Sequence, residues 1–300
     1  MYHQPVLLKE SLDGLNINPD GIYVDVTFGG GGHSQKILEQ LNHGKLIAFD
    51  QDKDAEKNAI QDERFVFIRH NFRFMKNFLK YIDYPQVDGI LADLGVSSHH
   101  LNSPERGFSF RYDAALDMRM NQNNPLTAAE VINTYSEQAL KDILKNYGEL
   151  KTPGRITQAI LKARSDKKIQ SVQHLIEAVE KYIPERFRNK TLAKIFQAIR
   201  IEVNQEMQSL KKFLGQTRDV LKPGGRLVVI SYHSIEDRLV KNFMKSGNFS
   251  GTLHKDFYGN VASPFRLINK KVITPTDKEI VENNRARSAR LRIAEKWEEA

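Results

Sequence analysis

Short apolar runs separated by polar turns recur through the first hundred residues of the chain. They cover residues 22–26, 45–50, 65–68 and 87–95. Runs of this length bounded by turn residues are typical of strands buried in a parallel sheet. A fifth run, residues 226–231, follows a Pro-Gly-Gly turn much later in the chain. The pattern therefore predicts an α/β fold in which a long insertion separates the fourth strand from the fifth.

Helical spacing of apolar residues follows the first strand and then dominates the insertion. Ser34 is expected to cap the first of these helices. Farther along, Thr127 begins a capping-box pattern, Thr152 and Pro153 suit a helix start, and Ser171 precedes another apolar stripe. We therefore expect a main domain built from residues 1–115 and 206–300, with a helical domain at residues 116–205 inserted for substrate recognition.

The most informative motif joins the first strand to the first helix. Asp25 lies near the end of the strand, and residues 29–32 are four glycines. Glycines let a backbone approach a ligand closely and adopt positive φ. A carboxylate beside them would repel the pyrophosphate of a dinucleotide and suit a cation. The motif favours a methyltransferase that uses S-adenosylmethionine over a dehydrogenase; a glycine-rich turn with a solvated Asp25 is the alternative.

Acidic residues also end the second and fourth predicted strands. Asp50 lies about twenty residues beyond the glycines, where an acid commonly accepts hydrogen bonds from a ribose. Asp93 and Gly95 close the fourth strand. Because open parallel sheets bind ligands at the carboxyl ends of their strands, these acids are expected to lie at one site.

Composition narrows the choice of function. The chain has 300 residues, no cysteine and a formal net charge of +8, which suits a polyanionic partner. The absence of a long apolar run and of a signal-peptide pattern predicts a cytoplasmic protein that does not enter membranes. His33, His99, His100 and His233 lack metal-site spacing, so we expect no catalytic metal. No G-x-S-x-G elbow of a serine hydrolase occurs.

The C-terminal segment alternates apolar and basic side chains. If it is a strand, Ala289, Leu291 and Ile293 face the core while Arg290 and Arg292 face outward. Guanidinium groups fixed on a sheet match phosphates. We therefore expect basic residues of the helical insertion to hold a nucleic-acid backbone together with four C-terminal arginines, Arg285, Arg287, Arg290 and Arg292. A charged edge strand protected from aggregation is the alternative.

Seven blocks spread over nearly the whole chain, taken together, resemble one family, the MraW-type S-adenosylmethionine-dependent methyltransferases. That family modifies the exocyclic amine N4 of a cytidine in small-subunit ribosomal RNA. The blocks are residues 27–34, 93–98, 105–110, 116–120, 196–204, 233–238 and 285–288. The resemblance implies a class I methyltransferase (Rossmann-like) sheet with an inserted helical domain. It also implies a partner, either small-subunit ribosomal RNA or the assembled small ribosomal subunit, and leaves a monomer or a homodimer open.

The resemblance also implies which residues contact S-adenosylmethionine. The family's contacts fall on Gly31, Gly32, His33, Asp50, Phe72, Asp93 and His100. The glycines and His33 would surround the methionine moiety, Asp50 would accept the ribose hydroxyls, and Phe72 would pack against adenine. Asp93 would border the transferred methyl group. Two positions depart from the family pattern: Gly30 replaces a common Arg or Lys, and residues 98–100 replace Ser-Pro-Gln.

A cytosine amine is a weak nucleophile, so positioning and acceptance of its proton should dominate catalysis. We expect Asp93 to be catalytic as that acceptor. Phe108 or Phe110 could stack on the base, or both could be core residues; His233 could contact the substrate or cap a helix. An NAD-dependent oxidoreductase and a noncatalytic ribosome-assembly factor are the rival functions. The sequence does not specify the modified nucleotide.

Overall fold

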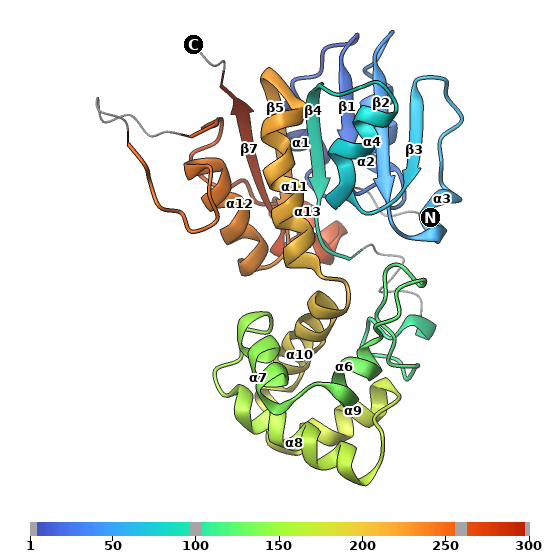
Figure 1. Cartoon of the computed structure of the whole chain (residues 1–300), viewed down its shortest axis with the longest axis vertical. Helices are drawn as coiled ribbons and strands as arrows, with labels where there is room; N and C mark the ends of the chain where they lie inside the picture. The colour runs from blue at the N-terminus through green and yellow to red at the C-terminus, as the bar shows by residue number, and fades with distance from the viewer. Residues whose placement is uncertain (1–4, 97–103, 256–262, 298–300) are drawn as a thin grey trace. The chain divides into compact units, whose positions relative to one another are not determined.

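The computed structural model describes residues 5–96, 104–255 and 263–297, and the chain divides into two compact units (Figure 1). One of them, the sheet unit, combines residues 1–95 with residues 207–300. The other, the helical unit, comprises residues 96–206. The sheet unit is therefore assembled from the two ends of the chain.

A seven-stranded sheet forms the centre of the sheet unit, in the order β3-β2-β1-β4-β5-β7-β6. Strands β1 to β5 are parallel, whereas β7 is antiparallel to both β5 and β6. The strands are β1 (Ile22–Asp25), β2 (Lys45–Asp50), β3 (Phe65–Arg69), β4 (Val87–Asp93), β5 (Leu221–Ser231), β6 (Phe265–Leu267) and β7 (Arg290–Lys296). This Rossmann-like arrangement confirms the predicted α/β fold class.

The strand order reverses between β1 and β4. The chain proceeds from β1 outward to β3 and then returns to place β4 on the other side of β1. Asp25 at the end of β1 pairs in register with Leu91 of β4. Ligands of open α/β sheets bind outside the carboxyl ends of the strands at such a reversal, so the fold itself locates the candidate site.

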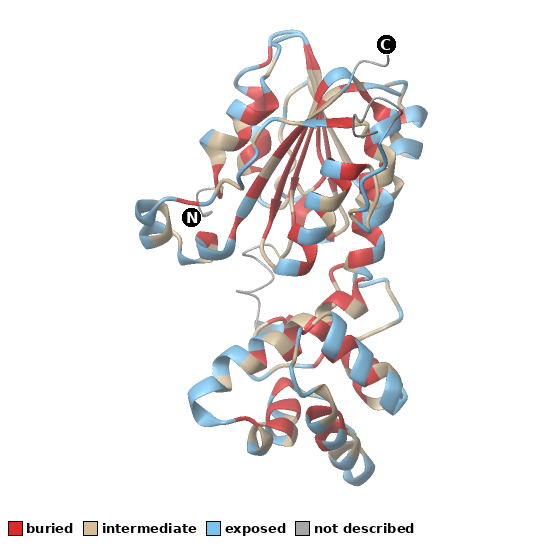
Figure 2. Cartoon of the chain, turned by 90° about the vertical axis from the view of Figure 1, so that its left-hand side faces the viewer, coloured by how far each residue is buried: buried red, intermediate tan, exposed pale blue. Residues whose placement is uncertain are grey.

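Helices cover both faces of the sheet, and the central strands β1, β2 and β4 are mostly buried between them (Figure 2). Alternation along β1 shows the two faces: Val24 packs with Phe213 in one apolar cluster, and Tyr23 packs with Leu15 and Ile37 in the other. The helices of this unit are α1 (Leu8–Leu15), α2 (Gly32–Leu38), α3 (Lys53–Glu56), α4 (Met75–Tyr81), α11 (Glu206–Val220), α12 (Ser234–Ser246) and α13 (Asp277–Glu282). Short 3-10 turns occupy Phe72–Phe74 and Asn284–Ser288.

Two local predictions were wrong. Helix α2 is capped by Gly31 in a left-handed conformation, and Ser34 lies inside the helix, where its hydroxyl donates to Asp25 at 2.7 Å. The Pro-Gly-Gly segment lies within β5 and does not precede it; Gly224, with φ of 76°, accompanies a register shift between Val87 and Gly89. In both places a glycine with positive φ, which costs no Cβ clash, fixes the backbone.

The predicted C-terminal strand exists, but it is not an edge strand. In β7, Leu291 and Ile293 are buried as the alternation predicts. Strands β5 and β6 flank β7 on its two sides. The alternative in which charge protects an exposed sheet edge is therefore wrong.

The helical unit packs around its own apolar core. Its helices are α6 (Ala128–Thr134), α7 (Glu137–Asn146), α8 (Pro153–Asp166), α9 (Val172–Val179) and α10 (Arg188–Val203), with 3-10 turns at Pro104–Arg106, Glu180–Tyr182 and Glu185–Phe187. Thr127 forms the predicted capping box, and Ser171 caps α9. The compact unit begins before residue 116 because Phe108 is buried in this core and the Phe110 ring lies 5.6 Å from that of Phe196. Both aromatics thus follow the core alternative.

One buried amide ties the segment before α6 to the end of α10. The side chain of Asn204 accepts the Met120 amide at 2.7 Å and donates to the carbonyls of Met118 at 2.8 Å and Arg200 at 2.9 Å. Met118 has φ of 59°, a left-handed conformation that is costly for a side chain of this kind. The hydrogen bonds of Asn204 on both sides of Met118 therefore hold a strained turn in place.

Replacing this amide should destabilise the helical unit. Asn204→Ala would leave the Met120 amide and the Met118 carbonyl without their buried partner, at about 2 to 4 kcal/mol in the free energy of unfolding. Denaturant unfolding followed by circular dichroism measures the change, with Asn123→Ala at an exposed position as the matched control. Equal unfolding midpoints for the two variants would contradict this role of Asn204.

Candidate active site

The glycine loop after β1 is held against the end of β2. Gly29 and Gly31 have φ of 53° and 77°, and a Cβ on Gly31 would lie 2.9 Å from the Phe28 ring. The Gly29 amide donates to Oδ2 of Asp50 at 2.9 Å. Positive φ and close packing together require glycine here, which supports the prediction of a loop shaped for close approach to a ligand.

Asp50 is oriented by the backbone at the end of β2. Besides Gly29, its carboxylate accepts the Asp52 amide at 2.8 Å through Oδ1. A carboxylate has about four lone-pair sites, so accepting amides and accepting ribose hydroxyls are compatible. The arrangement agrees with the ribose-binding role expected of this residue.

Asp25 does not face a ligand, contrary to our interpretation of its charge. It is 2% exposed, and it accepts the Ser34 hydroxyl at 2.7 Å and the Thr27 amide at 3.0 Å. Burial raises the pKa of the Asp25 carboxyl above its usual value, although His33 and these hydrogen bonds oppose the shift. Asp25 thus organises the loop from inside, and the solvated alternative is also wrong. The acid that reaches the site is Asp93.

Asp93 ends β4 with its side chain 24% exposed. Its amide donates to the Thr27 hydroxyl at 2.6 Å, and its Oδ1 accepts the Tyr232 hydroxyl at 2.8 Å. The other oxygen, Oδ2, lies 3.9 Å from Nδ1 of His33. Burial raises the pKa of Asp93 to about 6, against the opposing effects of His33 and the Tyr232 hydrogen bond. A carboxyl group with this pKa is half ionised near pH 6 and mostly ionised at neutral pH, where it can accept a proton.

His33 connects the loop to the N-terminal segment. It is 7% exposed, and its Nε2 lies 3.1 Å from the Val6 carbonyl oxygen. Pro5 lies so close to Gly32 that any Cβ there would collide with its ring. Residues 5–7 therefore pack over the start of α2, which explains why residue 32 must be glycine.

Two further residues, Phe72 and His100, were predicted to contact the cofactor. Phe72 is half-buried beside the sheet, with its ring 5.4 Å from that of Phe213, and Asn71 caps its 3-10 turn. His100 lies outside the described residues. The structure thus brings Gly31, Gly32, His33 and Asp93 to one place, with Asp50 bonded to the same loop.

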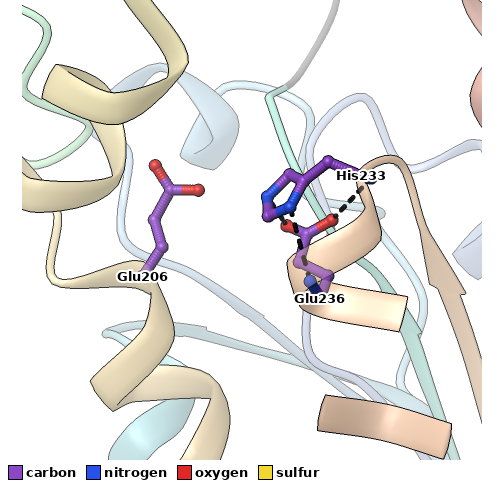
Figure 3. Close-up of side chains that lie close together, drawn as sticks. All are labelled: Glu206, His233 and Glu236. Atoms are coloured by element: carbon purple, nitrogen blue, oxygen red, sulfur yellow. Dashed lines mark hydrogen bonds and ion pairs between the residues drawn. The ribbon is translucent and has the colours of Figure 1, made fainter. Parts of the chain in front are cut away.

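His233 caps helix α12, which is one of the two roles that we considered for it, the other being contact with the substrate. Its Nδ1 accepts the Glu236 amide at 3.4 Å, and Oε2 of Glu236 accepts the His233 amide at 3.4 Å (Figure 3). The same Oε2 also accepts the Tyr232 amide at 3.0 Å. This reciprocal capping box fixes the turn from β5 into α12. Glu206, also drawn in Figure 3, is the first residue of α11 and the last residue of the helical unit, and it accepts two hydrogen bonds from Arg200.

Sequence reasoning missed Tyr232. Its hydroxyl reaches Asp93 across 139 positions of the chain. The only sequence signal was its place directly after the fifth apolar run, where parallel strands present side chains to a site.

The arginines of β7 have partners within the chain. Arg292 donates to Asp237 at 2.7 and 3.1 Å, and Arg290 donates to it at 3.2 Å. Although burial opposes the shift, hydrogen bonds and charge from these arginines lower the pKa of the Asp237 carboxyl. Arg292, whose side chain is 15% exposed, therefore anchors α12 to the sheet, whereas Arg290 is 47% exposed and its contact with phosphates stays a prediction. Within the described residues, no helix is long and apolar enough to cross a membrane.

Comparison with known proteins relates the whole chain to one family. A sequence model described as the MraW methylase family matches residues 1–297. "Ribosomal RNA small subunit methyltransferase H" of Bacteroides thetaiotaomicron is 58% identical over 296 residues, covering 98% of this chain and 97% of the relative. The protein of the same name from Flavobacterium johnsoniae is 60% identical, covering 98% of each chain. Among solved structures, TrmN from Thermus thermophilus covers 97% of this chain and 48% of its own, with 13% identity and a TM-score of 0.43.

Asp50→Ala should weaken the binding of S-adenosylmethionine. Loss of two charge-assisted hydrogen bonds from ribose hydroxyls is expected to cost about 2 to 4 kcal/mol, at least about thirtyfold in Kd. Isothermal titration calorimetry measures the change, with Asp142→Ala on the exposed face of α7 as the control. Unchanged affinity, or a preference of the native protein for NAD, would show that Asp50 does not hold this cofactor.

Proposed function

The chain belongs to the MraW methylase family, and we propose that it methylates N4 of a cytidine in the decoding region of small-subunit ribosomal RNA. It is an S-adenosylmethionine-dependent ribosomal RNA methyltransferase. The observation that supports the finer statement is the carboxyl group of Asp93 at the end of β4, whose side chain is 24% exposed and whose pKa is raised by burial to about 6. This group lies where the sheet places its ligands.

S-adenosylmethionine is the methyl donor, and the described residues fit it. The positive-φ glycines at 29 and 31 allow close approach of the backbone, and Asp50 presents an oriented carboxylate beside them. The donor supplies a methyl group activated by the positive charge of its sulfonium. We propose that Gly31, Gly32 and His33 hold its methionine moiety, Asp50 its ribose and Phe72 its adenine, with His100 as a further contact.

Asp93 is proposed to accept the proton that the amine loses. The lone pair of N4 is delocalised into the cytosine ring, so N4 gains basicity only as it pyramidalises toward the methyl group. An ionised carboxylate hydrogen-bonded to N4 favours that change and takes the proton. The raised pKa of about 6 leaves Asp93 ionised at neutral pH, yet makes it a better base than an ordinary aspartate.

The family assignment argues against both rival functions, the NAD-dependent oxidoreductase and the noncatalytic ribosome-assembly factor. The raised pKa of Asp93 agrees with a catalytic role, since strongly perturbed carboxyl groups are more often found where chemistry occurs. Methyl transfer by the purified protein tests this directly.

The RNA surface is proposed to lie mainly on the helical unit, since Arg290 and Arg292 are engaged with Asp237. The turn between α9 and α10 exposes an aromatic ring among cations. Phe187 is 46% exposed, the Arg186 guanidinium lies 4.7 Å from its ring centre, and Lys190 is exposed one turn onward. Aromatic stacking with cations alongside is the usual means of holding single-stranded RNA.

The target cytidine must be unpaired when it reacts, because an N4 amine engaged in a base pair cannot meet the methyl group. An RNA substrate follows from the family. We propose further that the protein acts in the cytoplasm, as a monomer or homodimer, on either naked small-subunit RNA or the assembled subunit. Comparing methyl transfer to these two substrates distinguishes the last two possibilities.

Asp93→Asn should abolish the pH dependence of methyl transfer and slow it. The wild-type single-turnover rate is expected to rise with pH between about 5 and 7, because Asp93 accepts a proton only when ionised and its pKa is raised to about 6. The variant, which keeps the size but cannot ionise, should be about 100-fold to 10,000-fold slower at pH 7.5. Mass spectrometry of the RNA product locates the methyl group on N4.

Asp142→Asn serves as the control for this experiment and should behave as wild type. A rate for Asp93→Asn near that of the wild type, at saturating donor and RNA, would exclude Asp93 from the chemical step. Methylation of an atom other than N4 would overturn the proposed product.

The RNA surface makes a separate prediction. Phe187→Ala should weaken RNA binding by about 1 to 3 kcal/mol through loss of one stacked base. Arg186→Ala combined with Lys190→Ala should reduce the salt slope of binding by about one to two units. Both variants should retain the affinity for S-adenosylmethionine, and Tyr81→Ala, at an 84% exposed aromatic of the sheet unit, is the control. An unchanged slope would move the RNA surface elsewhere on the protein.

A further inference from the structure

We infer that Tyr232 is a positioning residue for methyl transfer: its hydroxyl holds Oδ1 of Asp93 so that Oδ2 faces the reacting amine. The inference rests on the proposed role of Asp93 as proton acceptor. It names a second residue of the same site, contributed by the far end of the chain.

The contacts of the Asp93 carboxylate assign different tasks to its two oxygens. Oδ1 accepts the Tyr232 hydroxyl at 2.8 Å, the ordinary length of a hydrogen bond from a hydroxyl group. Oδ2 lies 3.9 Å from Nδ1 of His33, beyond hydrogen-bonding distance. The side chain is nevertheless 24% exposed. Among the described residues, Oδ2 is therefore the oxygen left for a substrate amine, and the hydrogen bond to Oδ1 limits rotation of the carboxylate.

Tyr232 is itself held from two directions. Its amide donates to Oε2 of Glu236 at 3.0 Å, and Glu236 is 3% exposed within the capping box of α12. Its ring packs against Gly95, where a Cβ would lie 3.2 Å from Cδ2 of the ring and where φ is 104°. The phenol is thus placed by a helix cap and by a glycine that follows the strand ending in Asp93. Such support is what a precise catalytic geometry needs.

The hydroxyl remains a donor throughout the working pH range. Burial, together with the charge of Asp93 and their hydrogen bond, raises the pKa of Tyr232 well above its usual value. Four groups face Asp93 from the elements around it. His33 on α2 and Tyr232 after β5 favour its ionised form, whereas Asp25 on β1 and Glu236 on α12 oppose ionisation. Removing the Tyr232 hydroxyl therefore shifts this balance toward the protonated carboxyl.

Tyr232→Phe tests the inference because it keeps the ring and removes only the hydroxyl. The pH midpoint of the single-turnover methylation rate should move upward by about one unit, because the ionised carboxylate of Asp93 loses one hydrogen bond that stabilises it. At pH 6 the rate should fall about fivefold, because the ionised fraction of Asp93 falls from about one half to about one tenth, while near pH 8 the rate should recover to within about threefold of wild type. The KM for S-adenosylmethionine and for RNA should stay unchanged.

Tyr81→Phe, at an exposed position of α4, provides the matched control and should leave the midpoint where it is. The inference requires that Tyr232→Phe lose more rate at pH 6 than at pH 8, because a purely structural defect lowers the rate equally at all pH values. An unchanged midpoint for Tyr232→Phe, or an equal loss at pH 6 and pH 8, would overturn the inference.

Two further measurements keep the test valid if Tyr232→Phe folds poorly or if the proposed reaction is wrong. Incorporation of 3-fluorotyrosine at position 232, a stronger donor of nearly the same volume, should move the midpoint downward. Carbon-13 NMR of the Asp93 carboxyl in RNA-free protein should show the same shifts of its pKa. If NMR shows these shifts in the pKa of Asp93 but the protein transfers no methyl group, the proposed function fails and the contact between Tyr232 and Asp93 stands. If the protein transfers methyl groups but the pKa of Asp93 is the same in all variants, the inference about Tyr232 is refuted.

Discussion

Parallel strands β1 and β4 lie side by side, so their terminal carboxyl groups, those of Asp25 and Asp93, are brought to the same edge of the sheet. Two acids in a partly buried site oppose each other's ionisation. The two carboxyl groups lie in different surroundings. Asp25 is enclosed by the hydroxyl of Ser34 and the amide of Thr27, whereas the side chain of Asp93 is 24% exposed and, within the described residues, hydrogen-bonded to Tyr232 through Oδ1. Folded Asp93 has a pKa near 6 against an ordinary value near 4. Between pH 4 and pH 6 the folded protein therefore binds more protons at this group than the unfolded chain does. Its free energy of unfolding falls by roughly 3 kcal/mol as pH rises through that range.

The glycine loop depends on the same pair of acids. Thr27 donates its amide to Asp25, and its hydroxyl accepts the amide of Asp93, so one residue connects both strand ends. Asp50 then fixes Gly29 from the end of β2. The loop that is proposed to hold the methyl donor and the carboxylate that is proposed to receive the proton are thus parts of one hydrogen-bonded unit. Substitution of Asp25 should therefore change the pKa of Asp93, and substitution of Asp93 should change that of Asp25.

Much of the fold could be predicted because a buried parallel strand is a continuous apolar run. The predicted strand at residues 45–50 has the bounds of β2, and the run at 87–95 contains β4. Helix caps were predictable where the capping side chain serves its own helix, as Thr127 does, and not at Ser34, whose hydroxyl is taken by Asp25. The place of β7 between two strands depends on pairing with β5 and with the three-residue β6, which leaves no periodic signal. Tyr232 was missed for a similar reason, since its contact with Asp93 is created only by the closing of the sheet.

The central claim is that this site places a methyl group on N4 of a cytidine in small-subunit ribosomal RNA. The most direct test compares ribosomal RNA from cells that carry the native protein, lack it, or carry Asp93→Asn in its place. Nucleoside mass spectrometry combined with fragment mapping follows methylation at each position. The account predicts one N4-methylated cytidine in the decoding region of the small-subunit RNA with the native protein and its loss in both other strains. An identical methylation pattern in all three strains, or loss of a modification at a different atom, would contradict it.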